Sequence, residues 1–192
     1  MTACDTLRWM LRAAAAALLF SAPGVARAID LSVESSAPGP RTVGVELVTS
    51  DGRTLRFPDD LAGEGTLLLS FTLTGCLAQC PPSDAIMDAV ARKARTEGLE
   101  GITLATLTLN PLDDTPERLQ AERARYLDPS RIFLTGHPAD VFAVLDGLAM
   151  RPSSGEDHSV RFVRWAPGDR EPSIRDGFVE PQELLDWVRS PP

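Results

Sequence analysis

Residues 67–71, with the sequence Leu-Leu-Leu-Ser-Phe, form an almost continuous apolar run of the kind that is buried on both faces in a parallel sheet. A helix is predicted soon after it, because Pro81 and Pro82 are tolerated in a first helical turn but not in a helix interior. Gly98 is expected to end this helix. Between them, apolar residues recur at four-residue spacing, at Ile86, Val90 and Ala94. A buried strand that leads into an amphipathic helix is a unit of an α/β fold.

The same alternation continues along the chain. Thr115 and Pro116 mark a second helix start, with Thr115 as the cap and Pro116 at the first helical position. The other predicted elements are strands at 102–109, 131–134 and near 160–165, and helices at 138–148 and 181–189. Three strand-helix steps, followed by a β-hairpin-like segment and a terminal helix, predict a central mixed sheet with helices on both faces.

An N-terminal β-hairpin is predicted before this alternation begins. Two β-type runs, at 43–48 and 53–57, flank Asp51 and Gly52. An Asp-Gly pair suits the positive backbone φ angles of a tight hairpin turn. The predicted fold class is therefore an α/β sandwich that begins with a hairpin.

Residues 1–28 have the features of a secretory signal peptide. Arg8 and Arg12 precede a short apolar run at 13–22, and small residues allow cleavage after Ala28. The run is about half the ~20 apolar residues that a membrane-spanning helix needs. Cleavage would also remove Cys4, one of the 3 cysteines.

The segment that follows, residues 29–41, is rich in Ser, Pro and Gly, and is predicted to be a flexible tether to a folded domain at 42–192. We therefore expect a soluble, periplasmic protein with no membrane span after signal cleavage.

The charge balance bears on the partners of the chain. The chain has 27 acidic and 19 basic side chains and a formal net charge of -8 at pH 7. Because a protein binds a phosphate backbone through positive charge, we expect no nucleic-acid partner.

Cys76 and Cys80 are four residues apart at the predicted junction of a strand and a helix. This spacing places the two sulfurs close enough to share a metal ion or to form a disulfide. A helix N-terminus favours the thiolate form, which both metal binding and thiol-disulfide exchange require. An inert stabilising disulfide is a third interpretation, although so short a loop constrains the unfolded chain little.

The chain has two histidines, His137 and His158. His137 is predicted to be a loop residue before a helix. His158 follows a loop and precedes a strand, and it is interpreted either as a solvated residue or as a ligand. Two thiolates and one imidazole form a ligand set suited to copper, particularly Cu(I).

Four segments in order resemble the SCO/SenC family of thioredoxin-fold copper proteins, which assist cytochrome c oxidase assembly. They are FTLTGC with Cys80-Pro81 at 71–81, TLNPLDDTPE at 108–117, LTG at 134–136 and DHS at 157–159. The resemblance implies a thioredoxin-like sandwich in which Cys76, Cys80 and His158 bind a copper ion, either Cu(I) or Cu(II).

The resemblance further implies a metallochaperone whose partner is the copper-accepting subunit of a membrane oxidase or another periplasmic copper protein. The alternative function is that of a thiol-disulfide oxidoreductase, in which Cys76 and Cys80 cycle between dithiol and disulfide to keep the cysteines of a target reduced. A weaker alternative is a copper sensor or antioxidant module of the same fold.

Overall fold

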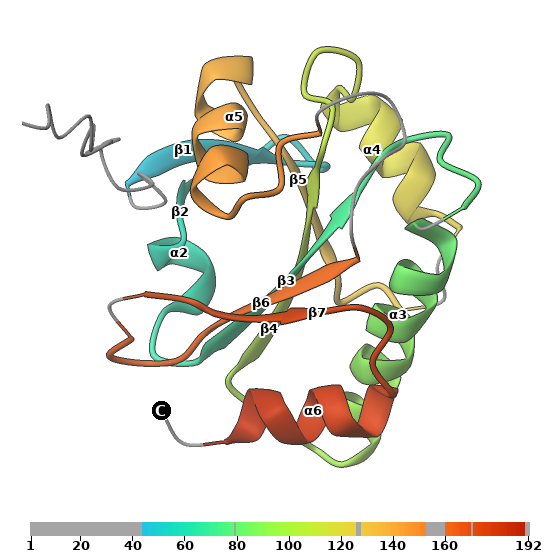
Figure 1. Ribbon diagram of the computed structural model, residues 1–192, viewed down its shortest axis with the longest axis vertical. Helices are drawn as coiled ribbons and strands as arrows, with labels where there is room; N and C mark the ends of the chain where they lie inside the picture. Colours follow the sequence, from blue (N-terminus) through green and yellow to red (C-terminus); the bar gives the residue numbers. More distant parts are fainter. Residues whose placement is uncertain (1–43, 79, 126–127, 153–159, 170, 191–192) are drawn as a thin grey trace, which may run out of the picture. The chain divides into compact units, whose positions relative to one another are not determined.

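The computed structural model describes residues 44–78, 80–125, 128–152, 160–169 and 171–190. In this part of the chain, seven strands form one mixed sheet with the order β2-β1-β5-β4-β3-β6-β7 (Figure 1). The strands are β1 (Val45–Thr49), β2 (Thr54–Phe57), β3 (Thr66–Thr72), β4 (Ile102–Thr108), β5 (Ile132–Thr135), β6 (Arg161–Trp165) and β7 (Ser173–Asp176). The helices are α2 (Asp59–Ala62), α3 (Cys80–Thr96), α4 (Pro116–Arg123), α5 (Pro138–Gly147) and α6 (Pro181–Arg189).

The predicted N-terminal hairpin is confirmed. β1 pairs antiparallel with β2, with Val45 opposite Phe57. Gly52 has a φ of 85°, which glycine adopts at little cost, and Asp51 precedes it in the turn. β1 also pairs antiparallel with β5, and this pairing attaches the hairpin to the main sheet.

The centre of the sheet contains the strands that the apolar runs predict. β3 pairs parallel with β4, and β4 pairs parallel with β5. Six of the seven residues of β3 are buried, in agreement with the apolar run at 67–71. β6 and β7 complete the sheet as an antiparallel hairpin beside β3.

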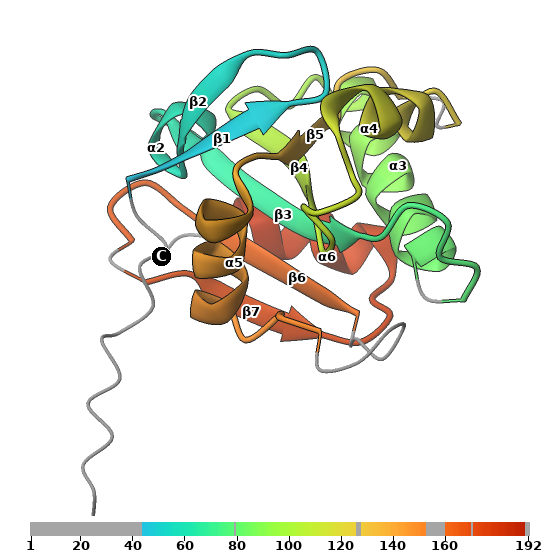
Figure 2. The same ribbon diagram turned by 90° about the horizontal axis from the view of Figure 1, so that it is seen from above.

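Helices cover both faces of the sheet, as predicted. α5 packs on one face, where its buried residues join a cluster with Phe57, Leu69 and Trp165. α3 and α6 pack on the other face, around Leu68 and Phe162 (Figure 2). The buried side of α3 includes Met87 and Ala91 with Val90 and Ala94, whereas Ile86 is only half-buried.

One consequence of this architecture matters for the site. The parallel strands β3, β4 and β5 run in one direction, so the loops that follow them meet at one end of the sheet.

Within the described residues, no helix has the length and apolar character needed to cross a bilayer. The predicted signal peptide (1–28) and tether (29–41) lie outside the described residues.

Candidate metal centre

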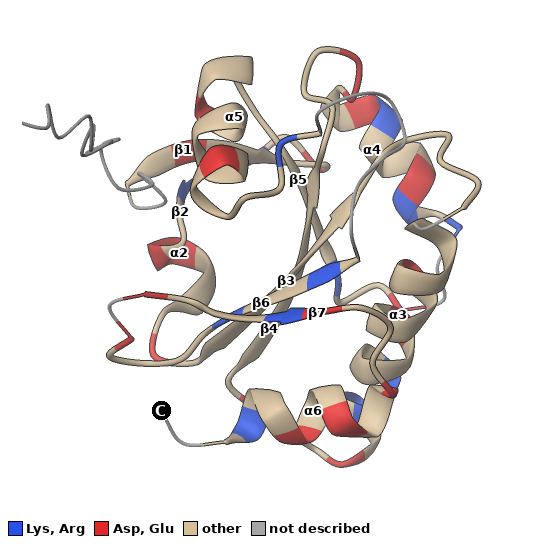
Figure 3. Ribbon diagram, in the orientation of Figure 1, with Lys and Arg blue, Asp and Glu red and all other residues tan. Residues whose placement is uncertain are grey.

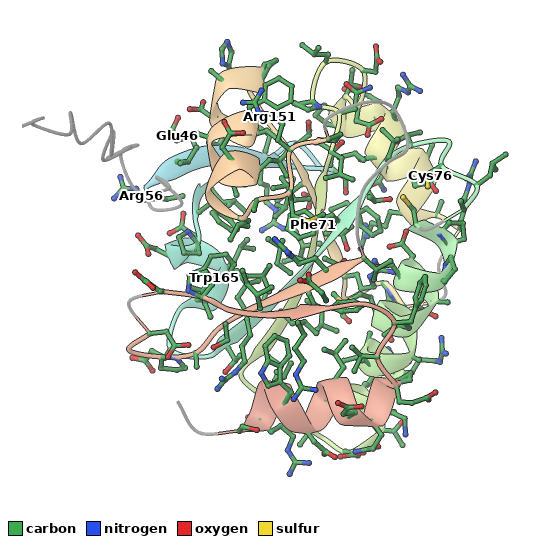
Figure 4. All side chains as sticks on the ribbon, in the orientation of Figure 1. Glu46, Arg56, Phe71, Cys76, Arg151 and Trp165 are labelled. Carbon is green, nitrogen blue, oxygen red and sulfur yellow. The ribbon has the colours of Figure 1, made fainter. Side chains whose placement is uncertain are left out.

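Cys76 lies in the loop that follows β3, and Cys80 is the first residue of α3. The apolar run of β3 ends at Thr72, and a turn at Thr74 and Gly75 redirects the chain. Gly75 has a φ of 87°, and the backbone N–H of Cys76 donates to the carbonyl of Leu73 at 2.9 Å. Figure 4 shows Cys76 beside the start of α3. The sequence prediction that the cysteines occupy a strand-to-helix junction is therefore confirmed.

The two cysteines contact each other. The backbone N–H of Cys80 donates to the Sγ atom of Cys76 at 3.4 Å, and a side-chain hydrogen bond also joins the two residues. Cys76 is 8% exposed and Cys80 is 3% exposed, and both carry thiols rather than a disulfide in this structure. Two adjacent soft sulfur donors suit a soft ion such as Cu(I).

The pKa of the Cys80 thiol is raised well above its usual value, chiefly because burial disfavours the charged form. Hydrogen bonding to Cys76 and the negative charge of Asp84 act in the same direction, and a hydrogen bond with the backbone of Leu73 opposes them. At Cys80 the effect of burial therefore opposes the thiolate form that a helix N-terminus favours. An ion that binds Cys80 must displace its proton, which makes binding depend on pH.

A buried ion pair lies one helical turn beyond Cys80. Asp84 on α3 is 1% exposed, and its Oδ1 atom accepts a hydrogen bond from Nη2 of Arg131 at 2.5 Å. Arg131 also donates from Nη1 to the carbonyl of Asp84 at 3.1 Å and from Nη2 to the hydroxyl of Thr106 at 2.8 Å. These bonds attach the first turns of α3 to β4 and to the start of β5.

A second buried carboxylate connects the cysteine loop to its neighbour. Asp114, which is 2% exposed, accepts hydrogen bonds at Oδ2 from the hydroxyl of Thr108 at 2.6 Å and from the backbone N–H of Thr74 at 3.3 Å. Its carbonyl accepts from the hydroxyl of Thr135 at 2.8 Å. The loops after β3 and β4 are therefore held together two residues before Cys76.

Sequence reasoning did not identify Asp84, Arg131 or Asp114 as parts of this site. One signal was available, since Asp84 is four residues after Cys80 and residues at that spacing share a helix face. The spacing alone does not show that Arg131, 47 residues later, lies opposite that face.

Thr115 caps α4, as predicted, with its hydroxyl accepting from the backbone N–H of Arg118 at 3.4 Å. A hydrogen bond with Thr115 also lowers the pKa of the Glu117 carboxyl. Replacing Thr115 with alanine is expected to lower the free energy of unfolding by about 1 kcal/mol, because the cap is lost. Urea denaturation measures this loss, and Thr115→Ser, which keeps the hydroxyl, should restore most of it. Equal losses in both variants would show that the methyl group rather than the cap matters.

The structure describes one of the two histidines, His137, but not the other, His158. His137 precedes α5, as predicted, and its Nδ1 atom accepts from the backbone N–H of Ala139 at 3.3 Å, so it serves as a helix cap. His158, the predicted third copper ligand, lies outside the described residues. Among the residues that the structure does describe, no group of three or more His, Cys, Asp or Glu side chains could hold a metal ion.

The fold matches several solved structures of Sco proteins. A copper-bound ScoI from Arabidopsis thaliana has a TM-score of 0.66 and 20% identity, covering 77% of this chain and 95% of that chain. BsSco, described as a member of the Sco family of cytochrome c oxidase assembly proteins with a disulfide switch, has a TM-score of 0.64 and 21% identity, covering 78% and 94%. A putative electron transfer protein from Aquifex aeolicus has a TM-score of 0.64 and 25% identity, covering 76% and 88%.

No curated protein matches the sequence. The sequence pattern of the family described as SCO1/SenC, however, matches residues 42–161, which are more than half of the chain and include Cys76 and Cys80. This match agrees with the thioredoxin-like sheet and with the cysteine pair at the end of β3. The chain belongs to the SCO1/SenC family.

Proposed function

We propose that this protein is a periplasmic metallochaperone that binds one copper ion and delivers it to the copper-accepting subunit of a membrane cytochrome oxidase, or to another periplasmic copper protein. The observation that carries the proposal is the contact between two buried thiols, Cys76 and Cys80, at the end of β3 in a SCO1/SenC chain. Solved relatives from Arabidopsis thaliana, Bradyrhizobium japonicum and yeast hold copper, which supports copper as the cargo.

In this proposal, Cys76 and Cys80 supply two sulfur ligands and His158 supplies an imidazole nitrogen. Cys80 releases its proton when the ion binds, because only the thiolate is a ligand. The buried setting of both sulfurs keeps water away from the ion. The pair of Asp84 and Arg131 holds the first turn of α3, and therefore Cys80, in place.

A thiol-disulfide oxidoreductase is the second candidate, favoured by the hydrogen bonds between the two cysteines. The description of BsSco as having a disulfide switch supports it as well. In this function, Cys76 and Cys80 pass two electrons and two protons to a disulfide of the target. The target disulfide becomes two thiols, and Cys76 and Cys80 become a disulfide themselves. The two functions can coexist in one protein, because the reduced cysteine pair binds copper and the oxidised pair does not.

His158→Ala distinguishes the two functions. If copper delivery is the function, the variant should bind Cu(II) much more weakly and Cu(I) somewhat more weakly, because two thiolates hold Cu(I) alone. Thiol-disulfide exchange should change little. Competition titrations with chelators for each oxidation state, together with exchange assays on a model disulfide, provide the measurements.

His137→Ala is the matched control, because His137 already caps α5. The copper function is contradicted if His158→Ala keeps wild-type affinity for both oxidation states. In the oxidoreductase function, His158 would act as a proton-transfer base. Exchange should then slow by up to about 100-fold in the variant.

Export to the periplasm is a separate part of the proposal. It rests on the arginines, short apolar run and small residues of positions 1–28. We expect the mature chain to begin at Ile29, which mass spectrometry of the periplasmic fraction measures. Ala28→Asp should block cleavage, because the residue before the cleavage point must be small. An intact N-terminus in the membrane fraction of wild-type cells would show that the segment is an anchor.

A further inference from the structure

Arg164 is a buried arginine near the end of the sheet that lies away from the cysteines. It lies on β6 opposite Leu68 of β3 in the strand register, on the face that α3 and α6 cover. The residue is only 4% exposed. Leu68 belongs to the apolar cluster on this face, together with Phe162 and Val188.

The guanidinium of Arg164 is incompletely satisfied. Its Nη2 atom donates to the carbonyl of Ser190, directly after α6, while Nε is buried and has no acceptor among the described residues. No ion pair within the described part of the chain involves Arg164. Arg131, the other deeply buried arginine, has Asp84 as its partner. A buried cation is costly without an anion, and the described residues provide none for Arg164, so an anion that reaches it should bind favourably.

Arg164 also lines a cavity of about 380 Å³. Thr66 and Ile102, at the beginnings of β3 and β4, line it as well, so the cavity lies at the end of the sheet away from the loop of Cys76 (Figure 1). Arg189, from the last turn of α6, lines the cavity too, but its charge is paired with Glu97 at 3.6 Å, and Glu100 supplies a negative charge. Figure 3 shows one basic position at the end of α6, where Arg189 lies, and acidic positions along the rest of the helix.

We propose that this cavity is a binding site for a carboxylate anion, with Arg164 as its principal ligand. A guanidinium presents paired N–H donors whose geometry matches the two oxygens of a carboxylate. A singly charged anion suits the site better than a doubly charged one, because the Glu100 carboxylate repels additional negative charge. The site is independent of the cysteines and of the proposed copper function.

Acetate is the probe for the test, with chloride at matched ionic strength as the reference. The backbone amide NMR signals of Gly101 and Ile102, which line the cavity, should shift saturably with acetate. The melting temperature should rise with acetate as well, because a ligand of the folded state stabilises it. A response of the wild-type protein to chloride equal to its response to acetate would overturn the proposal.

Arg164→Gln should weaken acetate binding by about 10- to 100-fold, because a charge-assisted hydrogen bond is lost. Arg164→Lys, which keeps the charge without the paired donors, should bind with intermediate affinity. Glu100→Gln should strengthen binding. Arg161→Gln is the matched control, since Arg161 lies on the same strand but pairs with Asp176, and it should bind acetate as the wild type does. Unchanged acetate affinity in both Arg164 variants would overturn the proposal.

Two sources of the carboxylate are distinguished by comparing a tripeptide that has a free C-terminus with its amidated form. Binding of the free tripeptide that is tighter than that of acetate and is lost on amidation would identify a peptide terminus. Tighter binding of acetate than of the free tripeptide would identify a small organic acid. Tighter binding of sulfate than of either would overturn the carboxylate assignment. Copper affinity should be unchanged in Arg164→Lys, which separates this site from the cysteine pair.

Discussion

Replacing either Cys76 or Cys80 with serine should abolish tight Cu(I) binding, whereas the wild-type protein should bind about one Cu(I) per chain. The reason is that a hydroxyl is a hard donor that keeps its proton near neutral pH, whereas a thiolate is a soft donor. A side-chain hydrogen bond joins the two cysteines, so each variant leaves a single sulfur at the site. Anaerobic titration against a competing Cu(I) chelator measures both the stoichiometry and the affinity.

Loss of binding must be separated from loss of folding in this experiment. Circular dichroism should show native secondary structure in both serine variants, because serine is similar in shape to cysteine. Ser83→Ala is a matched control, since Ser83 is another small buried residue in the first turns of α3. Unchanged stoichiometry and affinity in both cysteine variants would contradict the assignment of these residues as ligands.

Replacing Arg131 with leucine should reduce the free energy of unfolding by about 3–5 kcal/mol, because it leaves the Asp84 carboxylate buried without its cation. Arg131 is 1% exposed and donates to both the carboxylate and the carbonyl of Asp84. The double variant Arg131→Leu with Asp84→Leu should recover most of this loss, because an apolar pair carries no cost of burying charge. Urea denaturation of the three proteins measures these differences.

Arg53→Leu is the surface control for the buried pair. Arg53 pairs with Asp51, and the two side chains are 69% and 50% exposed. Its loss should change the free energy of unfolding by less than about 1 kcal/mol. If Arg131→Leu were no more destabilising than Arg53→Leu, the buried pair would not contribute to holding the first turns of α3.

The sequence predicts most of the core elements because their signals are local. The apolar run at 67–71 specifies a buried strand, and Thr115 with Pro116 specifies where α4 begins. Asp51 and Gly52 likewise specify the N-terminal turn. Each of these patterns spans a few residues and agrees with the physical environment that the sheet provides.

The elements that escape prediction lack such signals. α2 is a single turn of four residues at Asp59–Ala62, which is too short to show helical periodicity. β7 is an edge strand whose residues are exposed or only half-buried, so Ser173–Asp176 shows no clear alternation of apolar and polar residues. The sequence indicates a hairpin-like segment there without locating this second strand.

The cysteine pair of the candidate site is predictable from the sequence, but the residues that hold it in place are not. The spacing of Cys76 and Cys80 predicts that they lie close together, and hydrogen bonds join them in the structure. The raised pKa of Cys80 depends chiefly on its burial, which the spacing of the two cysteines does not specify. The partners of Asp84 and Asp114 are likewise set by strand order, which no local pattern encodes.

The two cysteines are fixed by different kinds of backbone structure, and this difference bears on the rate at which each could exchange a bound ligand. Cys80 is part of a helix whose next turn is fixed by Arg131, whereas Cys76 belongs to a turn fixed by the Leu73 carbonyl and by a neighbouring loop. Rearranging a turn disturbs fewer hydrogen bonds than rearranging a helix. If the two cysteines hold a copper ion, as proposed, ligand exchange is therefore expected to begin at Cys76, with Cys80 as the sulfur that lets go last. Substitutions in the turn of Cys76 are then expected to change the rate of copper exchange more than substitutions in the first turns of α3 do.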